Sequence, residues 1–227
     1  MDQKQIQQAT TFLTTEHFVL QGMRSGTIAE ANGRLSNYLT VVSSALVALA
    51  FVAQISDGAF FLRFGLVILP ILTYLGFTTC ARLVQLREAD FQYVQAMNRI
   101  HHFYLDVAPD AEQYLSSSPY DDFRGNFQTV VGVKPPETMP RPGRFHPLLY
   151  TTAGQVEVIN SFIFGVFAAL LARNFNLATT LAVIIGAVGG VIGYIFHIAY
   201  DAQVSKFIEQ QTEFRFPTPG REEPNAE

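Results

Sequence analysis

The sequence predicts an all-α membrane protein with four transmembrane helices and a helical cytoplasmic region. Charged residues make up only 15% of its 227 residues and hydrophobic residues make up 49%, whereas a typical soluble domain has about 25% charged residues. The charged residues are absent in blocks rather than thinned evenly. Because the blocks are about as long as a helix that crosses a bilayer, these observations together predict the fold class.

Four apolar blocks define the predicted spans. They cover 35–55, 64–81, 151–172 and 177–200. A hydrocarbon core of ~30 Å needs roughly 20 residues of apolar helix, so the first and fourth blocks fit readily and the second is short. The third block is the weakest because Glu157 stands in its first turns. A soluble all-α protein with buried helices is the alternative, but segments without a polar face argue against it.

Lysine and arginine predict the orientation of the spans. Thirteen of the 15 basic residues lie before the first span, between the second and third, or after the fourth. The two short hairpins hold only Arg63 and Arg173. Because basic residues accumulate on the cytoplasmic side, we expect both termini and the central segment in the cytoplasm, and the hairpins 56–63 and 173–176 outside.

The spans divide the chain into successive segments. These are a cytoplasmic amphipathic helix (1–34), a first transmembrane hairpin (35–81), a cytoplasmic helical stalk and Pro-rich connector (82–150), a second transmembrane hairpin (151–200), and a cytoplasmic helix with a disordered tail (201–227). The basic residues of the N-terminal helix are balanced by acidic ones. We therefore expect that helix to pack on other cytoplasmic helices rather than to lie on the membrane surface.

The stalk carries a stripe of larger apolar side chains at helical spacing. Its members are Tyr93, Met97, Ile100 and Tyr104, and we expect them to serve assembly or gating. Pro109 ends the stalk, and a short helix near 110–117 and a turn at 118–122 follow. Prolines concentrated in 134–147 predict an extended connector. The last helix is expected to run on to about Phe214.

Glycines in the fourth span form the strongest local pattern. Gly186 with Gly190, and Gly189 with Gly193, give two overlapping GxxxG pairs, and Gly165 belongs to a stripe of small residues in the third span. Glycine lets helix backbones approach closely in lipid. We expect the third and fourth spans to pack against each other. A contact between subunits, or a hinge for opening, is the alternative.

The first span has polar residues at helical spacing. They are Asn37, Thr40, Ser44 and Gln54, interrupted by Val47 and Phe51. In a channel this face would line the path, whereas in a closed bundle it would make hydrogen bonds between helices. No acid or base stands at mid-depth in a predicted span, which argues against a proton-coupled pump or an ion-coupled transporter and permits a wide or weakly selective pore.

Two further residues are gating candidates. Pro70 lies inside the second span, where it removes a backbone hydrogen bond and should kink the helix. His197 lies near the cytoplasmic end of the fourth span, four residues before Asp201, so the two side chains can pair on one helix face. His197 is then either a pH sensor or a cap at the membrane interface.

The sequence shows no pattern for catalysis or for a metal. His101 and His102 are adjacent and point in different directions on a helix, so they do not suit one metal ion. No nucleophile elbow, Walker motif or dinucleotide-binding loop is present. A lipid-modifying enzyme is the weakest reading, with only His146, His197 and Asp201 as candidates. We expect no enzyme, no cofactor and no metal site, and the net charge of −4 without a basic run excludes nucleic-acid binding.

Three runs of the sequence carry a family resemblance. They are Glu16-His17-Phe18-Val19-Leu20-Gln21-Gly22-Met23-Arg24, Arg82-Leu83-Val84-Gln85-Leu86 and Asn98-Arg99-Ile100-His101-His102-Phe103-Tyr104. Together they resemble a group of uncharacterised, actinobacterial-type four-span integral membrane proteins, over most of the chain up to the fourth span. This resemblance implies a bacterial cytoplasmic membrane and transfers no activity. At the level of architecture alone the chain is similar to SLATT-type membrane effectors of bacterial defence, which implies pore formation or membrane disturbance.

The resulting hypothesis is a homo-oligomeric membrane channel or pore-forming effector, gated through its cytoplasmic helices. The first span would line the path, and the partners would be the lipid bilayer and further copies of the chain. A non-conducting, membrane-anchored module that recruits a cytoplasmic protein is the alternative. A small-molecule ligand is left open.

Overall fold

The computed structural model describes residues 1–135 and 151–219, and helices dominate this part of the chain. In chain order they are α1 (Gln3–Ile55), α2 (Gly58–Val107), the 3-10 helix η1 (Pro109–Tyr114), α3 (Phe123–Val131), α4 (Thr152–Asn174) and α5 (Thr179–Gln211). No strand occurs among the described residues. Helices α1, α2, α4 and α5 are each long and apolar enough to cross a membrane. The predicted all-α membrane protein with four spans, including the weak third span, is therefore confirmed.

The chain folds into two compact units. We call Glu30–Leu86 with His146–Phe207 the spanning unit, and Met1–Ala29 with Arg87–Phe145 and Ile208–Glu227 the polar unit. Helices α1, α2 and α5 contribute residues to both units. The prediction divides the chain at 34/35 and 81/82, and the compact units change over at 29/30 and 86/87.

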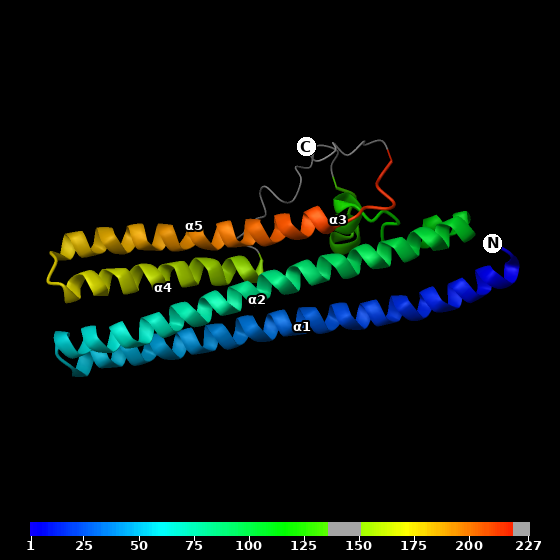
Figure 1. Ribbon diagram of the computed structural model, residues 1–227. Helices are drawn as coiled ribbons and strands as arrows, with labels where there is room; N and C mark the ends of the chain where they lie inside the picture. The colour runs from blue at the N-terminus through cyan, green and yellow to red at the C-terminus, as the bar shows by residue number, and fades with distance from the viewer. Residues whose placement is uncertain (136–150, 220–227) are drawn as a thin grey trace. The chain divides into compact units, whose positions relative to one another are not determined.

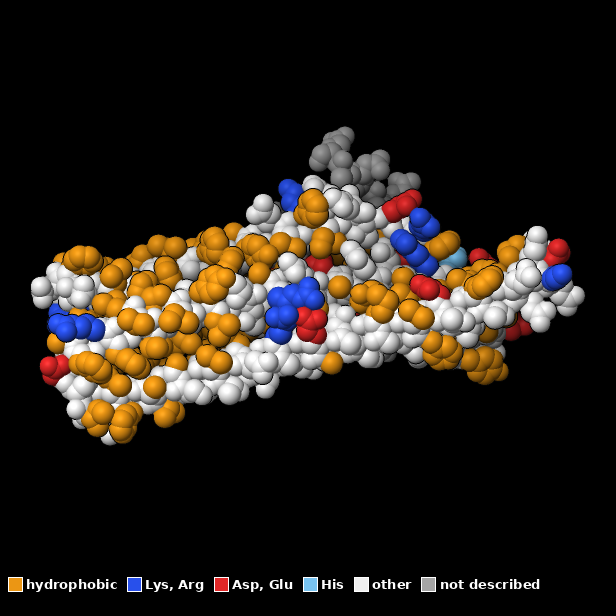
Figure 2. Space-filling view, turned by 60° about the horizontal axis from the view of Figure 1, so that its bottom comes forward, with side chains coloured by type: hydrophobic (Ala, Val, Ile, Leu, Met, Phe, Trp, Pro, Cys, Tyr) orange, Lys and Arg blue, Asp and Glu red, His pale blue; other side chains and the backbone are white. Residues whose placement is uncertain are grey.

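The spanning unit is a bundle of α1, α2, α4 and α5, which lie alongside one another (Figure 1). Its core is made of apolar side chains from three of these helices, among them Val42, Leu69, Leu72, Val156 and Ile163. Many other large apolar side chains face outward, and Figure 2 shows them spread over the visible surface of this unit. An apolar exterior suits lipid and would be costly in water.

The connections between paired spans are short. Asp57 caps α2, since its Oδ1 accepts a hydrogen bond from the Phe60 amide at 2.7 Å. Because α2 begins at Gly58, the predicted hairpin 56–63 was too long and Arg63 lies within the helix. Between α4 and α5, Asn176 takes the left-handed conformation with φ 58°, which asparagine tolerates better than most residues.

The polar unit has its own small core. Leu20 of α1 packs with Val94, Met97 and Ile100 of α2, and Leu13 and Tyr104 lie against this group. The prediction that the N-terminal helix packs on another helix is confirmed. The helix α3 was not predicted, although both ends carry ordinary signals: Asp122 caps its start and Gly132, with φ 79°, follows its end.

Asp121 fixes the segment that follows α5 within the polar unit. This fully buried carboxylate accepts hydrogen bonds from Arg99 Nε at 2.7 Å and from the amides of Arg215 and Phe216 at 3.0 and 2.8 Å. The neighbouring Asp122 accepts from the Thr218 amide at 2.9 Å. Helix α5 itself ends at Gln211, earlier than predicted. Three predicted features lie outside the described residues: the part of the Pro-rich connector that follows Pro135, the residue His146, and the end of the tail.

Candidate functional site

The predicted glycine pairs lie in the contact between α4 and α5. A Cβ added at Gly165 would lie 2.7 Å from the Gly186 carbonyl oxygen, and one added at Gly186 would lie 2.9 Å from the Gly165 carbonyl oxygen. A Cβ added at Gly190 would lie 3.4 Å from the Ser161 carbonyl oxygen, which is an ordinary contact distance. Gly189 and Gly193 lie against α4 side chains, with added Cβ atoms at 3.0 Å and 3.2 Å from their nearest neighbours. The structure thus uses all of these glycines within one chain.

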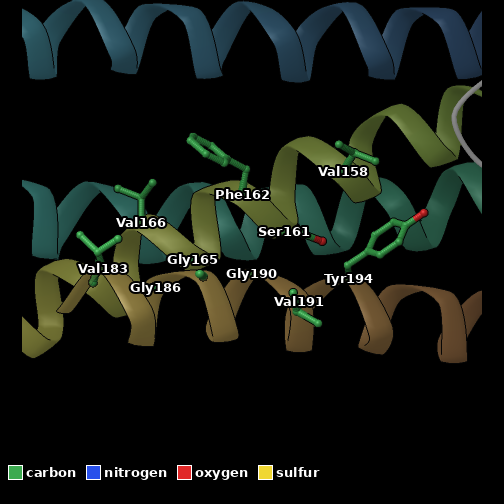
Figure 3. A pocket seen from close by; sticks show the side chains of 12 residues that line it. Val158, Ser161, Phe162, Gly165, Val166, Val183, Gly186, Gly190, Val191 and Tyr194 are labelled. Carbon is green, nitrogen blue, oxygen red and sulfur yellow. The ribbon is translucent and has the colours of Figure 1, made fainter. Parts of the chain in front are cut away.

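The same small residues leave a groove of about 710 Å³ along α4 and α5. Figure 3 shows Phe162 and Val166 of α4 and Val183 and Tyr194 of α5 around it. Its lining is almost wholly apolar, and the Ser161 hydroxyl donates to the Glu157 carbonyl oxygen of its own helix at 2.6 Å. Without converging polar groups, the groove has nothing to fix the orientation of a polar ligand.

Polar side chains from different helices meet inside the spanning unit. Asn160 of α4 is central: its Nδ2 donates to the Thr73 carbonyl oxygen of α2 at 3.1 Å and lies 3.1 Å from His197 Nε2 of α5. Tyr38 Oη of α1 donates to Asn160 Oδ1 at 3.5 Å. Asn160, His197 and Tyr38 are 2%, 3% and 1% exposed. This group, which we call the polar cluster, therefore connects all of the spanning helices.

An acidic residue lies one turn from Asn160. Glu157 is fully buried, and the Cys80 thiol of α2 donates to its Oε1 at 3.7 Å. The sequence reading treated Glu157 only as a weakness of the third span. In the structure it belongs to the buried interior, and an acid inside a membrane-spanning bundle is by default a hypothesis for a functional site.

The predicted pore-lining residues lie on the outside of the single chain. Asn37, Thr40, Ser44 and Gln54 are all exposed on α1. Thr40 and Ser44 donate their hydroxyls to carbonyl oxygens of their own helix at 2.9 and 2.8 Å, so they need no other partner. The amides of Asn37 and Gln54 make no side-chain hydrogen bond within the described part of the chain.

A stripe of mostly small residues accompanies them. Its exposed members recur at alternating spacings of three and four, and we call them the α1 stripe: Gly33, Ser36, Thr40, Ser43, Val47, Ala50 and Gln54. Around Thr40 the helix surface is hollowed, and the hollow is lined by Ser36, Ser43 and Ser44 among others. This spacing is that of helices that pack along a common seam. The polarity of the side chains alone does not reveal this stripe.

The residues predicted to serve gating or assembly lie in different environments in the structure. Met97 and Ile100 are buried in the polar unit, and Tyr93 and Tyr104 lie at the edge of that core. Tyr104 Oη also lies within hydrogen-bonding distance of Thr14 Oγ1, at 3.1 Å. The stripe thus packs against α1 within one chain, and its role in gating or assembly stays a prediction. Pro70 is part-buried inside α2, as expected.

His197 lies inside the spanning unit. It is buried beside Asn160, with the Phe77 ring of α2 6.1 Å away between centroids. Its Nδ1 has no hydrogen-bond partner among the described residues. Helix α5 thus turns His197 toward the bundle interior, and its roles as a pH sensor or an interfacial cap stay predictions.

An ion cluster joins the ends of the first two spans. The Arg82 guanidinium of α2 donates two hydrogen bonds to the Glu30 carboxylate of α1, at 3.0 and 3.1 Å, and Arg34 donates a third at 2.8 Å. The hydrogen bonds from Arg82 and then Arg34 lower the pKa of Glu30 to about 2. Charged groups thus stand where both apolar blocks end, as expected at a membrane surface.

The histidines of the polar unit have different neighbours. The His101 ring lies 5.1 Å from the ring of His17, whereas His102 stacks on Phe216 at 4.0 Å. Burial, and secondly the neighbouring His17, lower the pKa of His101. Within the described ranges, no group of three or more metal-binding side chains comes together.

Comparison with family models, curated proteins and solved structures finds no match to this chain. The candidate site is accordingly defined by its own geometry. It consists of the exposed α1 stripe and the buried polar cluster.

Proposed function

We propose that the protein is a non-enzymatic, homo-oligomeric channel of a bacterial cytoplasmic membrane, with both termini in the cytoplasm and α1 facing the symmetry axis. The observation that carries the proposal is the exposed polar face of α1. Asn37 and Gln54 are 17 residues apart, or about 25 Å along a helix. The two amides therefore bracket most of a hydrocarbon core of ~30 Å, with Thr40 and Ser44 of the polar face between them.

A path through the middle of one chain is disfavoured by its packing. The bundle centre is filled by buried side chains such as Tyr38, Leu69 and Val156. Water would have to displace these groups at a cost of several kcal/mol each. A path between copies requires no such change, because α1 already presents its polar face outward.

The α1 stripe supports close approach of copies around such an axis. Gly33 has open space where a Cβ would lie, and Ser36, Thr40 and Ser43 add little bulk. Small residues are what transmembrane helices use to associate in lipid. Val47 and Phe51, 69% and 61% exposed, interrupt the polar face. A ring of such residues forms a hydrophobic constriction, which gates by expelling water.

The charge distribution supports the orientation. Glu30, Arg34 and Arg82 lie at one end of the first two spans, and Arg63 and Arg173 mark the opposite ends of the two hairpins. Since basic residues gather in the cytoplasm, the end with most of them is assigned to that side.

The test is flux through liposomes that contain purified protein. In a Cys80→Ala background, Ser44→Cys places a thiol on the polar face and Val183→Cys places one on the exposed apolar face of α5. A charged thiol reagent added from water should block most of the flux through the Ser44→Cys protein and spare the Val183→Cys control. Absence of flux under any stimulus, together with a monomer in nanodiscs, would refute the proposal and favour the non-conducting interaction module.

A further inference from the structure

The hydrogen bonds of the polar cluster define the protonation state of His197. The Asn160 amide nitrogen has two hydrogens: one is donated to the Thr73 carbonyl oxygen and the other points to His197 Nε2. Nε2 must therefore accept, so the ring is neutral and carries its proton on Nδ1. Nδ1 is buried without a partner among the described residues.

A second proton on this ring would create a conflict. It would bind Nε2, which would then become a donor facing the amide donor of Asn160. Rotating the Asn160 amide by half a turn resolves the conflict, because Oδ1 would then accept from the imidazolium. The same rotation turns Oδ1 toward the Thr73 carbonyl oxygen, so the bond to α2 is lost, and it turns Nδ2 toward Tyr38 Oη, which can accept.

From this geometry we infer that His197 is a proton-binding site whose occupation breaks the Asn160 hydrogen bond to Thr73 of α2 and reverses the direction of the hydrogen bond between Asn160 and His197 of α5. The proton comes from bulk water, and no covalent bond is made or broken apart from the N–H bond. The exchange takes place within one chain, whether or not copies form a channel. It is also reversible, since loss of the proton restores the acceptor at Nε2.

The surrounding titratable groups come from all four helices. They are Tyr38 on α1, Cys80 on α2, Glu157 on α4 and Asp201 on α5, all of them buried. Glu157 precedes Asn160 by one turn and Asp201 follows His197 by one turn, so each lies on the same helix face as its neighbour. Both carboxyl groups thus belong to the same helix faces as the pair, and Asp201 Oδ1 accepts a hydrogen bond from the Ser205 hydroxyl at 3.3 Å.

Helix α2 is suited to respond when this bond is lost. Thr73 comes three residues after Pro70, and proline has no N–H to give to the preceding turn. Gly76, the next residue of α2 on this side, has no side chain and lies directly against the Asn160 amide. The Asn160 hydrogen bond thus ties α4 to α2 one turn after its proline.

The experiment measures the distance between α2 and α4 in nanodiscs as the pH is lowered from about 8 to about 5, the range in which histidines change charge. Spin labels replace the exposed Tyr74 and Phe162, each 72% exposed, in a Cys80→Ala background diluted with unlabelled protein. The mean distance should shift by about 1–2 Å, the size of a typical helix displacement. His197→Gln retains an acceptor but binds no proton, so its distance should be the same at every pH.

A matched control is His102→Gln, which alters a part-exposed histidine of the polar unit and should leave the response intact. Nitrogen NMR of the His197 ring supplies a second readout that does not depend on a variant, and at about pH 8 it should place the proton on Nδ1. An unchanged distance in the wild-type labels, a response that persists in His197→Gln, or a proton on Nε2 at high pH would each overturn the inference.

Discussion

Gly76 of α2 leaves the space that the Asn160 side chain of α4 occupies. A Cβ at position 76 would collide with Asn160 Oδ1, Cγ and Cβ. The glycine is therefore part of the polar cluster, although it contributes no polar side chain. Gly76→Ala should destabilise the bundle by about 1–3 kcal/mol, the usual cost of overpacking.

Unfolding in mixed detergent micelles measures this cost. Gly58→Ala is the matched control, since nothing lies within 4 Å of a Cβ at the start of the same helix. Wild-type stability of Gly76→Ala would show that Asn160 is free to move aside, and the polar cluster would lose its fixed geometry.

The α4–α5 contact predicts an order among its glycines. Gly165→Ala sets a Cβ against the Gly186 backbone, which cannot yield, whereas Gly193→Ala meets the rotatable Phe164 ring at 3.2 Å. The loss of stability should therefore be larger for Gly165→Ala, by about 1 kcal/mol or more. Thermal melting in detergent gives the comparison, and equal melting temperatures for the two variants would contradict the close backbone contact.

Asp121 should be essential for holding residues 215–218 in place. Asp121→Asn weakens its bond to Arg99 and its bonds to the Arg215 and Phe216 amides, at an expected cost of about 2–3 kcal/mol for bonds to a charged group. Hydrogen exchange at residues 215–218 should accelerate. Glu213→Gln, which removes an exposed ion pair with Arg215, should change little; comparable exchange in both variants would count against the anchoring role.

The polar unit should lose stability in mild acid. Burial lowers the pKa of His101 below its ordinary 6.5, so in that range the unfolded chain binds more protons than the folded one. Stability is thus unaffected above about pH 6.5 and falls as the pH drops further. His101→Phe should reduce this dependence in hydrogen-exchange measurements on α1 and α2. A stability that rises on acidification would mean that folding favours the charged form of His101 and would contradict this prediction.

The sequence predicted the spans because bilayer thickness imposes their length on any charge-free block. It also predicted the α4–α5 contact, since paired glycines have few other uses in lipid. The polar cluster was harder to foresee. Glu157, Asn160 and Ser161 lie on one helix face and were a usable signal, but the acceptor on α2 is the Thr73 backbone carbonyl, which no side-chain pattern reveals.

Other differences have local causes. The stripe from Tyr93 to Tyr104 was correctly recognised as apolar, but periodicity does not say whether a face meets its own chain or another copy. Helix α3 was overlooked although Asp122 and Gly132 mark its ends. The α1 stripe was overlooked because glycine, serine and threonine count as neither apolar nor charged.

Single-particle imaging of the protein in nanodiscs tests the central proposal most directly. For the proposed channel we expect several copies around one axis, with α1 of every copy nearest to that axis and with Thr40 and Ser44 facing a central opening. A monomer, or an assembly in which α1 lies on the lipid-facing perimeter, would contradict it.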